Sequence, residues 1–427
     1  MFFRYISKCS EAYVNIVNQI SSYLLSFEFL KIARINEAAF SRNTGKLPLP
    51  LLIASLLGGF TSKVQIELDE FFANLANRAD LLRIVSAQAF SKARNKVTEH
   101  ALPHLNDHFL SLVDRHVGFP LWYGYRIVAA DATVLRLTQQ FKTADGKTVV
   151  RHILDALGFA LYLPGIEMTL AATLYLPTVG EREMLVNHLN ILKPNDLLVL
   201  DRGYPAIWLI ALLLHRRHQF CMRSDGLNFG VVKHFIHTGL TEQIVTLPKL
   251  PKKLAKSLGI PRKTSTVRLI RQTFGKETRV LITSLLDAQF HPAESFNNLY
   301  HSRWRIEEAF KRLKHRLSLE HTSGLNWLAA QQDFAAKILC DNINALAVYS
   351  ACETLDPEIR NRYIINRTDA FVRIKRSLGR WLLLGLESLQ NVKDIFRELT
   401  RNLVRDKPGR SYPRVLKNKP HKSHAYK

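Results

Sequence analysis

One segment of the chain, which begins at Tyr300, reads YHSRWRIEEAFKRLK and combines a phenol, acids and several bases. Because an α-helix turns by about 100° per residue, residues three, four or seven apart share a face. Four side chains have this spacing and fall within about 60° of arc, so they form one stripe: Tyr300, Arg303, Glu307 and Lys314. Lys311 falls on the same stripe. A carboxylate among bases and a phenol suits a group that holds a metal ion among phosphates.

The adjacent face of the same segment is apolar. Ile306, Phe310, Leu313 and Leu317 cluster there, which predicts that this face packs on a core. The simpler alternative is an amphipathic helix whose charged face contacts solvent and has no chemical role. Two aspartates elsewhere in the chain favour the chemical interpretation.

Each of these aspartates belongs to a predicted strand. Asp131 lies within the β-branched segment 126–137, RIVAADATVLRL. Asp201 follows the apolar run of the segment 196–204, DLLVLDRGY, which is typical of a central strand buried on both faces. Gly203 then allows the backbone to turn sharply.

Three carboxylates of this kind could together catalyse attack on a phosphodiester. The oxygens of a phosphodiester are already negative, and enzymes overcome this with two divalent cations held by carboxylates. Magnesium prefers oxygen ligands, so such a site needs Asp and Glu rather than His and Cys. The candidates are Asp131, Asp201 and Glu307, which are separated by 70 and 106 residues.

The spacing Tyr-x2-Arg-x3-Glu-x6-Lys resembles the signature of bacterial insertion-sequence transposases of the insertion-sequence-4 family, in which the Glu is the third acid of an Asp-Asp-Glu set. Asp-Arg-Gly-Tyr at 201–204 and the strand of Asp131 match, by position, the segments that carry the other two acids; the resemblance covers roughly 120–330. It implies that Asp131 bridges two Mg²⁺ ions, for which Mn²⁺ can substitute. Asp201 and Glu307 would complete one site each.

The resemblance also implies contacts with DNA. Arg303, Tyr300 and Lys314 would contact the phosphates and the cleaved ends of the element, with Lys311 beside them. Trp304 would stack on an unpaired base near the cleavage point, or else pack as an ordinary core residue.

Other acids have simpler interpretations. Glu308 points away from the stripe and is expected in solvent, whereas Asp155 lies in a hydrophobic strand and could support the site from behind. Asp196 precedes the central strand and should lie at the opposite end from Asp201. Glu181 and Glu183 begin a predicted helix, where acids stabilise the helix dipole in any case.

The elements that must position the three acids alternate between strand and helix. The sequence predicts strands, then helices and further strands, in an order that resembles the ribonuclease-H-like α/β fold. The expected elements are strands 126–137, 152–163 and 169–177, helix 181–192, strand 196–204, helix 205–218 and strand 219–224.

Four regions are expected along the chain. Residues 1–118 form a helical DNA-binding domain, and residues 119–330 form the catalytic domain, interrupted by a β-rich insertion at 225–286. Residues 331–404 form a helical region that is a candidate for dimerisation, and 405–427 are a basic, disordered tail.

Basic side chains mark two of these regions as candidate DNA-facing surfaces. In the first region, a helix-turn-helix-like pair at 65–75 and 85–97 would turn four bases toward phosphates: Arg83, Lys92, Arg94 and Lys96. The insertion also carries many bases, including Lys252, Lys253, Arg268 and Arg271.

The bulk composition favours a polyanionic partner. The 427 residues include 60 Lys and Arg against 36 Asp and Glu, giving a net charge of +24 and a pI near 10.0. Neutralising phosphates releases counterions, so nucleic acid is the first candidate partner and an anionic membrane surface the second. No segment approaches the roughly 18 apolar residues of a membrane span, and the four scattered cysteines suggest neither disulfides nor zinc. A cytoplasmic, nucleoid-associated bacterial protein without a membrane partner is expected.

Together these features predict a DNA transposase. It would bind the inverted ends of its own element as a dimer, free a 3′-hydroxyl at each end and join it to target DNA. Two alternatives remain open: a ribonuclease-H-like nuclease that cuts without joining, and a catalytically silent DNA-binding protein.

Overall fold

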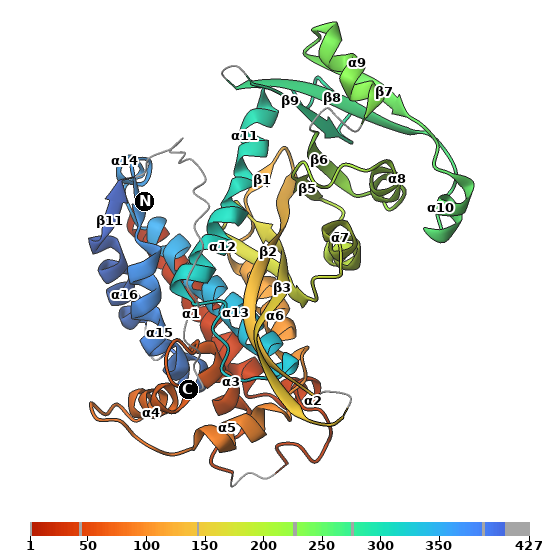
Figure 1. Ribbon diagram of the computed structural model, residues 1–427. Coiled ribbons are helices and arrows are strands. Elements are labelled where there is room, and N and C mark those ends of the chain that lie inside the picture. Colours follow the sequence, from red (N-terminus) through yellow and green to blue (C-terminus); the bar gives the residue numbers. More distant parts are fainter. Residues whose placement is uncertain are drawn as a thin grey trace.

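A mixed α/β arrangement is seen in the computed structural model, which describes residues 2–41, 45–142, 145–224, 229–274, 277–386 and 389–405 (Figure 1). A nine-stranded sheet lies at its centre, with the strand order β4-β3-β2-β5-β6-β9-β8-β7 and β1 paired to β2. The strands are β1 (Leu121–Trp122), β2 (Tyr125–Lys142), β3 (Thr148–Leu163), β4 (Met168–Tyr175), β5 (Asp196–Leu200), β6 (Gln219–Ser224), β7 (Glu242–Leu247), β8 (Ser265–Phe274) and β9 (Glu277–Thr283).

Strands β2, β5 and β6 are parallel neighbours, while β3 and β4 add to β2 as an antiparallel meander. Parallel strands need crossover connections, and helices α7 (Glu181–His188) and α8 (Ile207–His215) supply them. All five residues of β5 are buried, as its continuous apolar run predicts.

The predicted order of strands and helices is confirmed, but the first hairpin is longer than expected. The prediction ended the first strand at residue 137, where the apolar run stops, whereas β2 and β3 continue pairing to Lys142 and Thr148. Gly146 adopts a φ of 78° in the intervening turn, a conformation that glycine allows readily. Turn geometry and backbone hydrogen bonds therefore extend the hairpin where hydrophobicity gives no signal.

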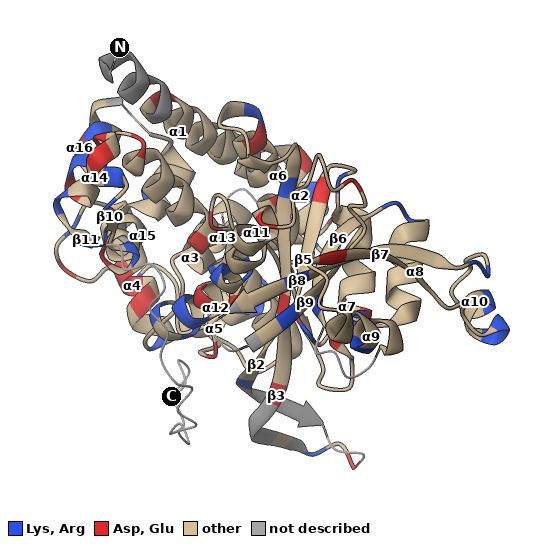
Figure 2. Cartoon of the chain, turned by 90° about the horizontal axis from the view of Figure 1, so that it is seen from above, with Lys and Arg blue, Asp and Glu red and all other residues tan. Residues whose placement is uncertain are grey.

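The insertion continues the central sheet. Strand β9 pairs antiparallel with β6, and β8 and β7 follow it, each antiparallel to its neighbour; helices α9 (Gly230–Thr238) and α10 (Lys252–Ser257) accompany them. Lys252 and Lys253 are exposed on α10, which lies at the far end of the insertion (Figures 1 and 2).

Two of the basic side chains expected to face DNA in the insertion have structural roles instead. Arg268 is 1% exposed, forms an ion pair with Glu242 and donates to the carbonyl oxygen of His291 at 2.7 Å. Arg271 donates to the carbonyl oxygens of Phe235 and Ile236, near the end of α9. The expectation that Arg268 faces DNA is wrong, because its side chain is buried against Glu242 and His291. Arg271 is half-buried and is held by carbonyl oxygens of the insertion itself.

Helices from both ends of the chain pack together beside the sheet (Figure 1). From the first part come α1 (Phe2–Leu24), α2 (Phe27–Ala33), α3 (Leu49–Leu57), α4 (Val64–Leu75), α5 (Ala87–Arg94) and α6 (Ala101–His116). From the last part come α13 (Trp327–Cys352), α14 (Pro357–Arg360), α15 (Arg367–Leu384) and α16 (Leu389–Arg401), with the short strands β10 (Tyr363–Ile365) and β11 (Leu403–Arg405). Helix α13 packs on β4 and on α1, α3 and α6, so the two helical regions share one core.

Arg94 corrects the expectation for the N-terminal helices. Helices α4 and α5 form near the predicted positions, but Arg94 is 1% exposed and its Nη2 lies 2.9 Å from Oδ1 of Asp333 on α13. Arg83 pairs with Asp69 at 2.9 Å, whereas Lys92 and Lys96 are exposed. The three nitrogens of this buried guanidinium all donate to partners within the fold, so the prediction that Arg94 faces phosphate is wrong; it joins the two helical regions.

The predicted basic tail lies outside the described residues except for Arg405, the last residue of β11. Among the helices of the described part of the chain, none is long and apolar enough to cross a membrane.

Candidate active site

The register of two parallel strands brings the two aspartates together. Ala129 of β2 is paired with Val199 of β5, and Asp131 and Asp201 each lie two residues further along. Residues two apart in a strand share a face, and adjacent strands are about 4.8 Å apart, so both carboxylates leave the same face at neighbouring positions. The pairing of β2 with β5 therefore brings together two aspartates that are 70 residues apart in the sequence.

The third acid approaches from a helix that packs on β2. Helix α11 (Ser295–Ser302) leads through Arg303 into α12 (Trp304–Arg316), which carries Glu307. Lys314 donates from Nζ to the carbonyl oxygen of Val134 at 2.6 Å. At the other end of the stripe, Arg303 contacts both Glu307 and Asp131, which places these two acids near each other.

Arg303 lies between the acids of β2 and α12. Its Nη2 donates to Oε1 of Glu307 at 2.6 Å, and its Nη1 is 3.9 Å from Oδ2 of Asp131. The side chain is 6% exposed, and its Nε and Nη1 have no hydrogen-bond acceptor in the described part of the chain. The single α-helical stripe predicted from the sequence is therefore nearly correct: the helix is interrupted at Arg303, but this residue keeps an α-helical backbone conformation.

The three acids influence one another electrostatically. Burial raises the pKa of Asp131 to about 7, and the charges of Asp201 and Glu307 add to this effect while Arg303 opposes it. Such repulsion among carboxylates is what a bound divalent cation relieves. The donor set is made of carboxylate oxygens, which suits Mg²⁺ or Mn²⁺. In the ranges that the structure describes, no group of three Asp, Glu, His or Cys side chains is close enough to hold a metal ion. At the three acids, Arg303 lies between Asp131 and Glu307.

The other predicted DNA contacts differ in exposure. Tyr300 is 4% exposed and packs among Leu197, Val199 and Cys221, and this burial raises the pKa of its phenol to about 12. Trp304 is 38% exposed.

The lysines of the stripe lie further along α12. Lys311 is 67% exposed, with Glu308 4.0 Å away, and Lys314 reaches back to β2. The stripe thus has a buried part at Tyr300 and Arg303 and an accessible part from Trp304 onward.

The rival acids are placed as follows. Glu308 is solvent-exposed, as expected. Asp196 is buried at the start of β5 in a bidentate pair with Arg126, with bonds of 2.6 and 2.7 Å, at the opposite end of the strand from Asp201. Asp155 is also exposed and lies opposite Arg136, so the suggestion that it supports the site from behind is wrong.

An ion-pair cluster that the sequence did not reveal holds α12 in place. Glu167, in the turn between β3 and β4, forms ion pairs with Arg305 of α12 and Arg367 of α15. Asp341 of α13 accepts from Arg312 at 3.0 Å. A glutamate in a turn is normally solvated, so nothing in the neighbouring sequence identifies Glu167 as a residue that holds α12 in place.

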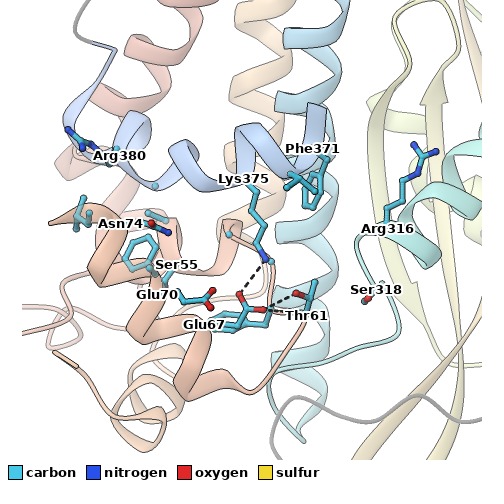
Figure 3. Close-up of a pocket in the computed structure, with 18 of the residues that line it drawn as sticks. Ser55, Thr61, Glu67, Glu70, Asn74, Arg316, Ser318, Phe371, Lys375 and Arg380 are labelled. Carbon is cyan, nitrogen blue, oxygen red and sulfur yellow. Dashed lines mark hydrogen bonds and ion pairs between the residues drawn. The ribbon is translucent and has the colours of Figure 1, made fainter. Parts of the chain in front are cut away.

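The cavity drawn in Figure 3 is remote from this chemistry. Its volume is about 400 Å³, and it lies between helices α3, α4 and α15, with Arg316 and Ser318 at one side. Glu67 in its wall already accepts hydrogen bonds from the Thr61 and Ser62 segment and pairs with Lys375. None of the three candidate acids lines this cavity.

Comparison with known proteins identifies the class to which this fold and site belong. The family model described as "Transposase DDE domain" matches residues 122–343, a span that contains all three acids. The chain belongs to the DDE transposase family and is therefore a metal-dependent enzyme of DNA cleavage and strand transfer.

A curated relative agrees with this assignment. The transposase InsG for insertion sequence element IS4 of Escherichia coli strain K12 is 22% identical over 404 residues, which cover 88% of this chain and 87% of that protein. The resemblance to insertion-sequence transposases of this type is confirmed. A solved piggyBac transposase synaptic complex with hairpin DNA matches with a TM-score of 0.42 and 11% identity, over 94% of this chain and 86% of that one, which is too distant to identify the fold.

Proposed function

We propose that this transposase binds the inverted ends of its own insertion sequence, hydrolyses one strand at each end and joins the freed 3′-hydroxyl to target DNA. The observation that carries the proposal is the register of β2 and β5, which sets Asp131 beside Asp201 under the helix of Glu307. Each step is an in-line phosphoryl transfer at the same three acids.

The arrangement of the first five core strands supports a ribonuclease-H-like catalytic core. Strands β2, β3 and β4 form an antiparallel meander, and β5 and β6 then join β2 in parallel, each after a helix. This gives the spatial order β4-β3-β2-β5-β6, with the catalytic aspartates on its first and fourth strands in chain order. Strands β7 to β9 are the inserted part.

Asp131, Asp201 and Glu307 would hold two Mg²⁺ ions, which supply charge stabilisation for the attacking and leaving oxygens. The fold positions the carboxylates that would hold these ions. Strands β2 and β5 hold two carboxylates rigidly, and the Glu167 anchor holds α12 against them. The guanidinium of Arg303 opposes the rise that burial causes in the pKa of Asp131, because a neighbouring cation favours the ionised carboxylate.

Assembly on DNA is part of the same proposal. Two ends must be held together, so a dimer on DNA is the natural assembly, with the helical regions 1–118 and 331–404 as the candidates for end binding and dimerisation. In the bacterial cell this enzyme would act at the nucleoid. Lys311, Lys314, Trp304 and Lys252 and Lys253 of α10 offer accessible contacts for the phosphate backbone or unpaired bases.

Strand transfer tests the proposal directly. A labelled duplex with the inverted repeat that flanks the gene, pre-cut to expose its 3′-hydroxyl, is incubated with supercoiled plasmid and Mg²⁺. We expect joining of the label to plasmid, and none from a matched 3′-dideoxy end. If DNA is nicked but the label is not joined to plasmid, the protein is a nuclease. If no reaction occurs with either Mg²⁺ or Mn²⁺, it is a catalytically silent DNA-binding protein.

Arg303 is predicted to recognise cleaved ends. In Arg303→Ala the buried guanidinium donors are lost, and we expect affinity for pre-cleaved ends to fall about 10-fold, or roughly 1.4 kcal/mol, with unrelated duplex affected less than 3-fold. Arg303→Lys keeps the charge but not the planar fork, so it should recover only part of the affinity. Electrophoretic mobility shifts measure both, and equal weakening for the two DNAs would contradict this role.

A further inference from the structure

Glu181 lies closer to the catalytic aspartates than its place in the sequence suggests. It is the first residue of α7, after Gly180, and its carboxylate faces the turn that follows β5. A Cβ placed on Gly203 would lie 3.1 Å from Oδ1 of Asp201 and 3.7 Å from Oε2 of Glu181. Both carboxylates therefore lie close to the same glycine, where no side chain comes near them.

The first turn of α7 is fastened to that turn. Arg182 donates from Nε to the carbonyl oxygen of Tyr204 at 3.1 Å and from Nη2 to that of Pro205 at 3.2 Å. The backbone N–H of Gly203 in turn donates to Oδ1 of Asp201 at 2.7 Å. These bonds fix Glu181 relative to Asp201, although the two residues come from different elements.

A buried phenol provides an independent sign that this pocket binds a ligand. Tyr204 is 0% exposed, and its hydroxyl has no hydrogen-bond partner in the described part of the chain. Burial raises its pKa well above the usual value, and the charges that add to this are those of Glu181, Asp131 and Asp201, in that order. These three carboxylates are therefore close enough to act electrostatically on the unpartnered hydroxyl.

Stabilisation of the helix dipole does not account for this placement. Glu183 belongs to the same first turn and would stabilise the dipole as well, but it lies about 200° further round the helix. Partial burial and then the charge of Asp201 raise the pKa of Glu181, even though the residue as a whole is exposed. Stabilisation of the helix dipole does not require Glu181 to lie near a second carboxylate.

We propose that Glu181 is a fourth carboxylate of the reaction site, which helps Asp201 to bind a divalent cation on the β5 side. The inference rests on the proposed two-metal function and extends it to a residue outside the three acids. Tyr204 supplies a buried, unpartnered hydroxyl that can donate to a carboxylate. A side chain at Gly203 would bring its Cβ close to both acids.

The test measures ion binding as well as activity. Free Mn²⁺ is titrated by electron paramagnetic resonance with the full-length protein, and the Mg²⁺ concentration for half-maximal cleavage of a cognate end is determined in parallel. For Glu181→Gln we expect about a 10-fold weaker Mn²⁺ affinity and a similar rise in the Mg²⁺ requirement. Glu183→Gln, which removes the same charge from the same helical turn, should leave both values unchanged.

A second variant keeps the proposal falsifiable if Glu181→Gln fails to fold. Gly203→Ala retains every charge but places a methyl group between the two carboxylates, and it should weaken Mn²⁺ binding in the same direction. The inference is overturned if the Mn²⁺ affinity and the Mg²⁺ requirement of Glu181→Gln lie within twofold of the wild-type values. If only Gly203→Ala folds, the same criterion applies to its Mn²⁺ affinity. Glu307→Gln serves as the reference. If it loses cleavage while Glu181→Gln needs no more Mg²⁺ than the wild type, the proposed function stands and the role of Glu181 falls. If Glu307→Gln also cleaves normally, the proposed function itself fails.

Discussion

Glu307→Gln is expected to lower the rate of end cleavage by about 1,000-fold or more, which corresponds to about 4 kcal/mol in the activation barrier. The amide keeps the size of the side chain but removes the negative charge that a divalent cation needs. Glu307 is 37% exposed at its side chain and has no part in the apolar face of α12, so folding should be unaffected. Binding of uncleaved ends should stay within about 3-fold of the wild type, because phosphate contacts from other residues dominate affinity.

The neighbouring Glu308→Gln is the matched control. Glu308 is 73% exposed and lies on the same helical turn, yet it points away from Asp131. It should cleave at nearly the wild-type rate. Simultaneous loss of end binding and of thermal stability in Glu307→Gln would show that Glu307 is a structural residue, and equal cleavage by the two variants would remove it from the site.

Asp333→Ala is expected to give the largest loss of stability, about 3–5 kcal/mol in the free energy of unfolding. It removes the counter-charge of Arg94, which stays buried on α5 with 1% exposure. The backbone N–H of Ser323, 2.6 Å from Oδ2 of Asp333, would also lose its acceptor. Because this pair joins the helices of the two ends of the chain, the loss should appear in the unfolding of both.

Equilibrium unfolding in urea measures this change, with Asp80→Ala as the control. Asp80 forms an Arg–Asp pair of the same type with Arg78, but both side chains are solvent-exposed, and its removal should have little effect on the free energy of unfolding. A loss for Asp333→Ala no greater than that for Asp80→Ala would mean that Arg94 finds other partners, such as Gln332 and the carbonyl oxygen of Ala329, sufficient.

Local periodicity made much of the fold predictable. The apolar run of β5, the β-branched segment of β2 and the helical spacing of Ile306, Phe310 and Leu313 each lie within a dozen residues. These three residues of α12 are buried as expected. The three acids could be nominated for the same reason, since each lies at a recognisable point of such an element. The sequence also predicted the order of strands and crossover helices, because parallel strands require them.

The roles of individual charged residues depended on distant parts of the chain. Arg94 looks like a surface base on its own helix, but its partner Asp333 lies 239 residues away. Arg268 looks like a DNA contact, yet β7 brings Glu242 against it.

The sequence by itself determined which elements form and which acids they carry, because hydrophobic patterning acts over a few residues at a time. Only the tertiary structure decided which charges are buried in pairs and which are left at the site. It brought Glu181 to Asp201, placed Arg303 between Asp131 and Glu307, and turned Arg94 inward. The physical reason is that a charged side chain is neutralised by whatever the fold places within a few ångströms of it, and that partner has no fixed separation along the chain.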